Sequence, residues 1–193
     1  FCPHLFKDGP TYYMVYDVAH NTAKLERHRV GGVVRSLLVH RKGATRAFGP
    51  GHRALPKAWR DLGQPVLIPG DMGRYSFVLV GRETAMRETF GSSCHGAGRV
   101  MSRTKALETF EWEKVNRVLK DRGVHLLSAG LDEVPMVYKN IHTVMAAQSD
   151  LVETLGQFDP KLVKMAPHGT LTLTIFTQVK SFVRTASSAS LSA

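Results

Sequence analysis

The chain has 193 residues, of which 43% are hydrophobic, and a formal net charge of +10 with a pI near 9.9. A chain of this length can bury one sizeable core, and nothing in it requires two domains. It has no run of about 18 apolar residues and no signal-peptide pattern, so we expect neither a membrane span nor secretion, and a cytoplasmic location by default.

The strong positive charge favours a polyanionic partner such as RNA or an anionic membrane surface. No basic amphipathic helix of the membrane-surface kind stands out, so we expect nucleic acid and no membrane. The two cysteines are too few for a disulfide framework in a chain of this size, which agrees with a reducing compartment.

The first part of the chain is expected to form strands. Residues 33–40 are rich in branched apolar side chains and predict a strand that leads into a basic loop at 41–46. Residues 65–68 and 75–80 predict two short strands with a glycine-containing turn between them.

Helices are expected later in the chain. From 103 to 122, apolar residues recur at helical spacing between charges, which predicts an amphipathic helix ending at Gly123. A second helix is expected at 141–155, ending at Gly156. Because strands and helices do not alternate regularly, we expect an α+β fold rather than a doubly wound sheet.

The end of the chain differs in composition from the rest. No acidic residue follows Asp159, and residues 170–177 alternate threonine with apolar residues before a Ser/Ala-rich end. We therefore expect residues 1–169 to belong to one domain, and residues 170–193 to be an atypical tail, either disordered or artefactual.

The segment at 92–103 carries a histidine, two glycines and two arginines in a compact pattern. Neutral imidazole is a competent nucleophile near pH 7, so His95 is a candidate. Gly96 and Gly98 would let a phosphate approach backbone N–H groups, and Arg99 and Arg103 would share a helix face at i and i+4. Spacing alone equally fits a glycine-rich turn that caps a helix with solvated arginines.

The sequence of this segment resembles the His-Gly-Ala-Gly-Arg signature of the RtcB family of RNA ligases. Stretches at 16–24, 38–47 and 63–73 match further family motifs in the same order. The resemblance runs from about Asp17 to about Pro167 and implies an RtcB-like mixed sheet with flanking helices.

The resemblance also implies that the chain is the C-terminal part of a longer ligase. It begins at Phe1, midway through what the family normally carries, and the upstream Asp/Cys metal motif is not found. The fold is therefore expected to be incomplete for lack of the N-terminal half, and Cys2 is not expected to ligate metal. The lysine near the family's end, which contacts the nucleotide, has no counterpart here.

The activity implied by the resemblance is GTP- and Mn²⁺-dependent joining of RNA 3′-phosphate or 2′,3′-cyclic phosphate ends to 5′-hydroxyl ends. It would serve tRNA splicing or RNA repair. His95 is the position that takes GMP from GTP as a phosphoramidate, and His20 matches a manganese ligand. Asp71 would accept hydrogen bonds from the guanine ring, whereas Tyr138 fits a place near the base and a place in the core equally well.

The candidate site residues fall into two groups. The resemblance implies nucleotide contacts by His20, Asn21, Pro69, Gly70, Asp71, Met72, Ser76, His95, Gly96, Ala97, Gly98 and Tyr138. The candidates for RNA phosphates are Arg41, Lys42, Arg46, Arg99 and Arg103, because arginine and lysine give salt-dependent contacts without sequence reading.

Two other functions remain open at this point. One is a truncated, catalytically inactive relative that binds RNA or a guanine nucleotide. The other is a metal-dependent phosphohydrolase that uses His20 and His95 as ligands.

Overall fold

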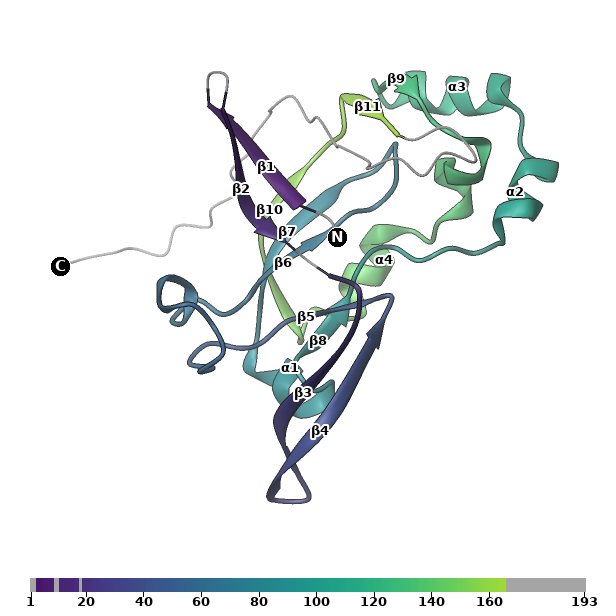
Figure 1. The fold of residues 1–193 in the computed structure, drawn as a ribbon. Helices are drawn as coiled ribbons and strands as arrows, with labels where there is room; N and C mark the ends of the chain where they lie inside the picture. The colour runs from purple at the N-terminus through teal and green to yellow at the C-terminus, as the bar shows by residue number, and fades with distance from the viewer. Residues whose placement is uncertain (1–2, 9–10, 18, 166–193) are drawn as a thin grey trace.

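The computed structural model describes residues 3–8, 11–17 and 19–165, and the tail expected at 170–193 lies outside them (Figure 1). The first two strands, β1 (Pro3–Asp8) and β2 (Thr11–Asp17), pair antiparallel with each other.

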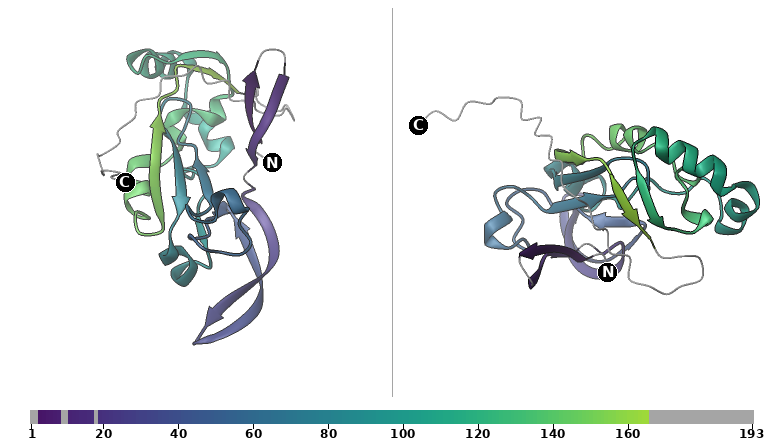
Figure 2. Two further views of the ribbon diagram at one scale, coloured as in Figure 1. Left: turned by 90° about the vertical axis from the view of Figure 1, so that its left-hand side faces the viewer. Right: turned by 90° about the horizontal axis from the view of Figure 1, so that it is seen from above.

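A long two-stranded ribbon follows and projects from the body of the molecule (Figures 1 and 2). It consists of β3 (Asn21–Val30) and β4 (Val33–Lys42), paired antiparallel along their whole length. The two residues that join them, Gly31 and Gly32, have φ values of 57° and 81°, as a two-residue turn that matches the strand twist requires. The predicted strand at 33–40 is confirmed.

The predicted basic loop at 41–46 is wrong. Strand β4 continues to Lys42, Gly43 turns the chain with a φ of 67°, and β5 (Ala44–Arg46) begins at once. Strand β5 pairs antiparallel with β8 (Ser92–Cys94), and this pairing keeps the segment extended.

A three-stranded antiparallel sheet forms the centre of the molecule, with the order β10-β7-β6. Its strands are β6 (Pro65–Ile68), β7 (Ser76–Gly81) and β10 (Val152–Phe158). The first two confirm the strands predicted at 65–68 and 75–80. The first core cluster packs around this sheet, and its buried members are Ala47, Val66, Ile68, Phe77, Leu79, Ala97, Ile141 and Val152.

The helix predicted at 141–155 is only partly correct. Helix α4 (Ile141–Ala146) ends early, and a turn in which the Leu151 N–H donates to the Gln148 carbonyl leads into β10. Strand β10 pairs along the free edge of β7, opposite the edge that β6 occupies. Sheet pairing therefore overrides the helical spacing of this stretch.

The helix predicted at 103–122 is two helices, α2 (Arg103–Thr109) and α3 (Trp112–Asp121), because Phe110 and Glu111 are extended. Phe110 and Trp112 both pack against the second core cluster. Side chains two positions apart cannot share a face of one continuous helix, so the break lets both reach the same core.

The remaining elements surround the two cores. They are η1 (Lys57–Trp59), α1 (Glu83–Glu88), β9 (His125–Ser128), η2 (Leu131–Glu133), η3 (Pro135–Val137) and β11 (Leu162–Lys164). Buried members of the second cluster are Met72, Ala106, Val115, Leu119, Val124, Val134, Val137 and Val163.

Separate sheets and helices of this kind confirm the α+β class. Of the pairings between the described strands, only β9 with β11 is parallel. Among the described residues, no helix has the length and apolarity that a membrane crossing needs.

Leu79 tests the first core. It is fully buried on the middle strand β7, so Leu79→Ala removes packed methyl groups and should lower the free energy of unfolding by about 2–5 kcal/mol. Leu155→Ala is the matched control, because Leu155 is 57% exposed and should change stability by less than about 0.5 kcal/mol. Urea denaturation measures both, and equal effects would contradict this account of the core.

Candidate functional site

Two histidines from distant parts of the chain stack on each other. His20 precedes β3 and His95 follows β8, and their ring centroids lie 3.8 Å apart with an interplanar angle of 15°. The Nδ1 atom of each ring is buried and has no hydrogen-bond partner. The structure thus brings together the predicted nucleophile and the predicted metal ligand.

Gly43 holds the backbones of both histidines. Its N–H donates to the His20 carbonyl at 2.9 Å, and its carbonyl accepts from the His95 N–H at 3.3 Å. Gly43 has a φ of 67°, a conformation that glycine adopts without strain. The turn between β4 and β5 therefore fixes the spacing of the two rings.

Burial disfavours the charged form of both imidazoles. Burial, together with the charge of His20, lowers the pKa of His95 to about 4. Burial also lowers the pKa of His20, and the charge of Lys42 acts in the same direction. A neutral imidazole carries a nitrogen lone pair at pH 7, which nucleophilic attack or metal ligation requires.

A buried ion pair docks the ribbon against the strand that leads to His95. The Arg41 guanidinium donates to both carboxylate oxygens of Glu26 at 2.8 Å. It also donates to Ser92 Oγ and to the Phe90 carbonyl, each at 2.8 Å. Arg41 therefore ties β3 and β4 to the start of β8. The sequence analysis missed Glu26. In the ribbon register Arg41 lies opposite Thr22 and Glu26 lies opposite Leu37, so strand pairing alone would not have signalled this ion pair.

Arg41 is consequently not placed to bind RNA. It is 3% exposed, and its donors are occupied by Glu26, Ser92 and Phe90. The prediction that it contacts phosphate is contradicted by this burial, whereas its neighbour Lys42 is exposed. Arg46 donates to Gln64 Oε1 at 3.0 Å and lies 4.8 Å from the centre of the Phe48 ring.

The loop at 69–73 lies directly beside the His95 segment. A Cβ on Gly96 would sit 3.2 Å from the Pro69 carbonyl oxygen, so these two segments are in close contact. The loop is anchored at both ends, because Ile68 belongs to the first core and Met72 to the second. The predicted glycine-rich segment and the predicted Pro-Gly loop therefore form one surface.

Several predicted nucleotide contacts lie around this surface. Gly98 has a φ of 76° and open space where a Cβ would stand, and Ser76 is half-buried at the start of β7. Asn21 is exposed at the start of β3. The side chain of Ala97 instead packs in the first core, so only its backbone remains for a ligand.

The side chains of Asp71 and Met72 point inward, which does not fit the predicted contact between Asp71 and guanine. Asp71 Oδ1 accepts from the Gly73 N–H at 2.8 Å, and Arg74 lies 3.4 Å from Oδ2. Burial raises the pKa of Asp71 despite these partners. Asp71 therefore shapes the loop from within.

Arg99 and Arg103 converge, but not through a shared helix face. Arg99 precedes α2 and forms a backbone bridge with Tyr138, so the predicted i and i+4 helical pair is wrong. Both guanidiniums reach Glu133 instead, Arg99 at 3.7 Å and Arg103 in a direct hydrogen bond. Arg103 is also paired with Asp132.

Tyr138 completes this cluster. Its hydroxyl donates to Glu133, and the Arg99 guanidinium lies 5.4 Å from the ring centre. Burial and the Glu133 carboxylate raise the pKa of Tyr138. Arg99 Nη2 is buried without a hydrogen-bond partner, so this cluster leaves one donor unsatisfied.

Gln148 is a second residue that the sequence analysis missed. It is buried in the turn that follows α4, where its Oε1 accepts from the Cys94 N–H at 3.0 Å and its Nε2 lies 2.8 Å from Cys94 Sγ. These bonds fix the residue that precedes His95.

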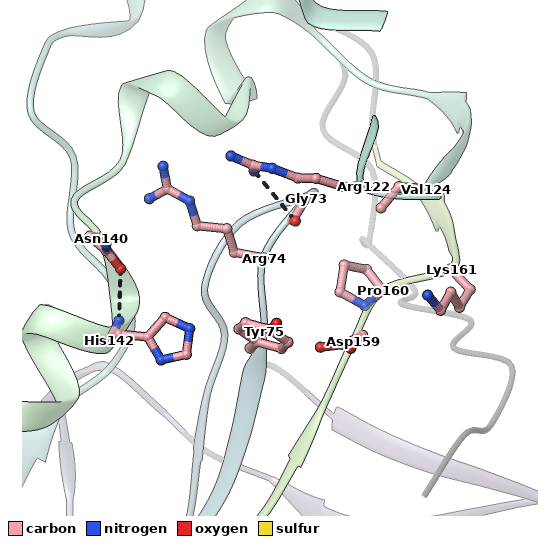
Figure 3. Close-up of a pocket in the computed structure, with 10 residues that line it drawn as sticks. All are labelled: Gly73, Arg74, Tyr75, Arg122, Val124, Asn140, His142, Asp159, Pro160 and Lys161. Carbon is pink, nitrogen blue, oxygen red and sulfur yellow. Dashed lines mark hydrogen bonds between the residues drawn. The ribbon is translucent and has the colours of Figure 1, made fainter. Parts of the chain in front are cut away.

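A cavity of about 400 Å³ lies beside the end of the 69–73 loop, where Gly73 lines it (Figure 3). Arg74, Arg122 and Lys161 bring three cations to it, and Tyr75 and His142 form part of its wall. Arg122 Nη1 reaches over Gly73 to the Gly73 carbonyl at 3.4 Å and lies 3.9 Å from Asp71 Oδ1. Two of the three cations are thus partly neutralised by Asp71.

The residues present do not form a complete metal site. Within residues 19–165, no group of three or more His, Cys, Asp or Glu side chains could hold a metal ion. His20 and His95 are two donors at most, and a catalytic transition-metal site needs at least three protein ligands.

Comparisons with known proteins identify a family. The family model described as tRNA-splicing ligase RtcB matches residues 4–165. Three similar curated proteins carry the name tRNA-splicing ligase RtcB. The one from Pyrococcus abyssi is 52% identical over 141 residues, the one from Thermococcus kodakarensis 53% over 136, and the one from Methanococcus maripaludis 47% over 160.

These matches cover 71%, 68% and 81% of this chain, respectively. They cover only 15%, 28% and 32% of the relatives. The chain therefore spans about a third or less of the length of these curated relatives.

Glu26→Gln tests the docking of the ribbon. It leaves the Arg41 charge buried without its carboxylate and should lower the free energy of unfolding by about 3–5 kcal/mol. The matched control is Glu153→Gln, which removes half of an exposed pair with Arg82 and should cost less than about 1 kcal/mol. Urea denaturation at pH 7 compares them, and similar losses would rule out a structural role for the buried pair.

The same variants carry a pH signature. Burial pushes the pKa of Glu26 up, but hydrogen bonds and charge from Arg41 and His28 outweigh it and hold the pKa below the ordinary 4.5. A lowered pKa stabilises the fold at pH values above the unfolded pKa, and this contribution is lost as the pH falls through the folded value. The stability gap between wild type and Glu26→Gln should therefore narrow below about pH 4.5. A gap that widens in acid would contradict it.

Proposed function

The chain belongs to the RtcB family of tRNA-splicing ligases, and from that premise we propose that its histidine pair serves GTP-dependent RNA joining. The reaction unites an RNA 3′-phosphate or 2′,3′-cyclic phosphate end with a 5′-hydroxyl end, in tRNA splicing or RNA repair. The observation that carries the proposal is the stacked, neutral pair of His20 and His95 beside the loop at 69–73.

His95 acts as the nucleophile. Its Nδ1 is buried, which leaves Nε2 as the nitrogen for an incoming phosphate. Nε2 attacks the α-phosphorus of GTP, a phosphorus–nitrogen bond forms, and the bond to pyrophosphate breaks with the electron pair leaving on pyrophosphate. Because the ring is already neutral, no separate base has to remove a proton before the attack.

The guanylyl group then passes to the RNA. A 2′,3′-cyclic phosphate end is first hydrolysed to a 3′-phosphate, as water adds to its phosphorus and the bond to the 2′-oxygen breaks. An oxygen of the RNA 3′-phosphate then attacks the guanylyl phosphorus, which breaks the bond to His95. The 5′-hydroxyl of the second RNA end next attacks the activated 3′-phosphate, loses its proton, and expels GMP. Each step transfers one phosphoryl group and needs no oxidant or reductant.

The nucleotide would lie over the surface formed by Pro69, Gly70, Gly96 and Gly98. Gly98 is open on its Cβ side, so the main chain around it leaves room for a phosphate oxygen to approach. Tyr138 borders this surface through its bridge to Arg99.

Lys42, Arg46 and Arg99 remain the candidates for RNA phosphates. Lys42 is exposed close to His20, and Arg99 has one donor without a partner. Arg103 is bound to Asp132 and Glu133, so it orients this cluster more readily than it binds a phosphate directly.

Manganese is the metal that we assign to His20. In the family reaction a divalent ion neutralises charge on the transferred phosphoryl group. The described residues do not provide a complete ligand set, so no step is attributed to an ion held by them.

A second candidate function is binding of RNA or a guanine nucleotide without catalysis. It is favoured by the incomplete donor set in the described part of the chain. Under this alternative, RNA affinity falls with salt and is unchanged by His95→Ala.

The nucleophile is tested in a chimera in which residues 19–165 replace the matching stretch of the Methanococcus maripaludis relative. Incubation with α-³²P-GTP and Mn²⁺, followed by a denaturing gel, should label the chimera. His95→Ala and His95→Gln should both reduce the label by more than a hundredfold, because each removes the attacking nitrogen.

The matched control is His125→Gln, because His125 is an exposed histidine on β9. It should retain full labelling, and circular dichroism should show all variants folded. Undiminished labelling of folded His95→Gln would refute the assignment. A chimera that binds RNA but takes no label would favour the binding function.

A further inference from the structure

A second cleft lies between the ribbon and the segment that follows β5. It has a volume of about 610 Å³, and residues 24–27 of β3 and residues 51–54 form two of its walls. This is the size of a small-ligand pocket, which gives room for roughly one or two nucleotides of a single strand.

Four cations line this cleft: Lys24, Arg27, Arg46 and Arg53. None of them forms an ion pair with a carboxylate of residues 19–165. The one acidic residue of the cleft, Glu26, is bound by Arg41 through both oxygens. The cleft therefore has a concentrated positive charge that the described residues do not neutralise.

His52 contributes a ring to the lining of this cleft. Burial lowers its pKa, and the charge of Arg46 is the next cause. The His52 ring is half-buried with its centre 4.0 Å from that of Phe48, and it borders the cleft. Histidine rings and arginine planes are surfaces on which unpaired bases stack.

Apolar side chains are exposed next to the same cations. Leu25 is 73% exposed and Val34 46% exposed, and both line the cleft. Cations beside uncovered apolar and aromatic surface fit a single nucleic-acid strand, which presents phosphates and base faces together.

The cleft is connected to the candidate site through one strand. Lys24 is four residues beyond His20 and Arg27 seven, so at strand rise they lie roughly 13 and 23 Å away along the chain. If the reacting end of an RNA lies at His95, the part of that RNA bound in the cleft would be a few nucleotides away from this end.

We propose that this cleft is an anchoring site for single-stranded RNA, in which Lys24, Arg27 and Arg53 contact the backbone phosphates away from the reacting end. The choice of RNA as the polyanion rests on the proposed function. The site would bind the RNA at a distance from its reacting end. Contacts to phosphates do not depend on the base sequence.

The test is RNA binding by this chain, measured by fluorescence anisotropy with a twelve-nucleotide single-stranded RNA at several salt concentrations. The variant Lys24→Gln/Arg27→Gln/Arg53→Gln should lose at least about tenfold in affinity. The slope of log affinity against log salt should become less steep by about 2, which is three lost contacts at about 0.7 each.

The matched control is Lys105→Gln/Lys114→Gln/Lys120→Gln, which removes the same charge from exposed positions of α2 and α3, far from the ribbon (Figure 1). It should lose less than threefold. Equal losses in the two triple variants would overturn the proposal, since RNA would then respond only to net charge. Displacement of the RNA by an equimolar mononucleotide would also overturn it, because the cleft would then be a free-nucleotide pocket.

The outcome is separable from that of the proposed function. If the cleft variant placed in the chimera keeps the His95 label but binds RNA weakly, both proposals stand. If no label forms on any protein while only the cleft variant loses RNA affinity, the cleft assignment stands and the ligase chemistry falls.

Discussion

The buried contact between Arg41 and Glu26 is the interaction on which the candidate site depends. A bidentate pair out of water is costly unless further hydrogen bonds satisfy the charged groups. Here Ser92 and Phe90 also accept from Arg41, so that each of its three side-chain nitrogens donates at least one hydrogen bond. The ribbon is thereby joined to the strand that carries His95. Gly43, two residues after Arg41, then holds both histidine backbones.

The second constraint is the anchoring of the 69–73 loop between two cores. Ile68 is fixed in the sheet core and Met72 in the helical core, and Asp71 ties the loop to Arg74 and Gly73 from inside. Chain stretched between two packed ends has little freedom to rearrange. The surface next to Gly96 is therefore largely formed in the absence of ligand, which reduces the entropic cost of binding.

Local sequence signals predicted those parts of the fold that local physics decides. Short apolar runs separated by a glycine turn predicted strands at 65–68 and 75–80, which the structure has at 65–68 and 76–81. Motif resemblance predicted that His20 and His95 belong to one site. Helix prediction failed at 152–155, where the chain instead pairs with the free edge of β7 as part of β10. It failed again at Phe110, which leaves the helix so that it and Trp112 can reach one core.

Side-chain roles that depend on distant partners could not be predicted. Arg41 is of a residue type that commonly contacts RNA. Its structural role follows only from its burial against Glu26 and against Ser92, which lies 51 positions further along the chain. Asp71 is similar, because its carboxylate turns inward to Gly73 and Arg74. Gln148 had no signal in the sequence, since its importance comes from the bonds to Cys94.

The central claim is that the neutral imidazole of His95 forms the covalent bond to GMP. The most direct measurement is mass spectrometry of the chimera after incubation with GTP and Mn²⁺ and neutral-pH digestion with trypsin, since phosphoramidates are lost in acid. The account predicts a GMP adduct on the peptide 88–99, whose one histidine is His95 and which contains no lysine. An adduct on any other peptide, such as one containing His20 or a lysine, would contradict it.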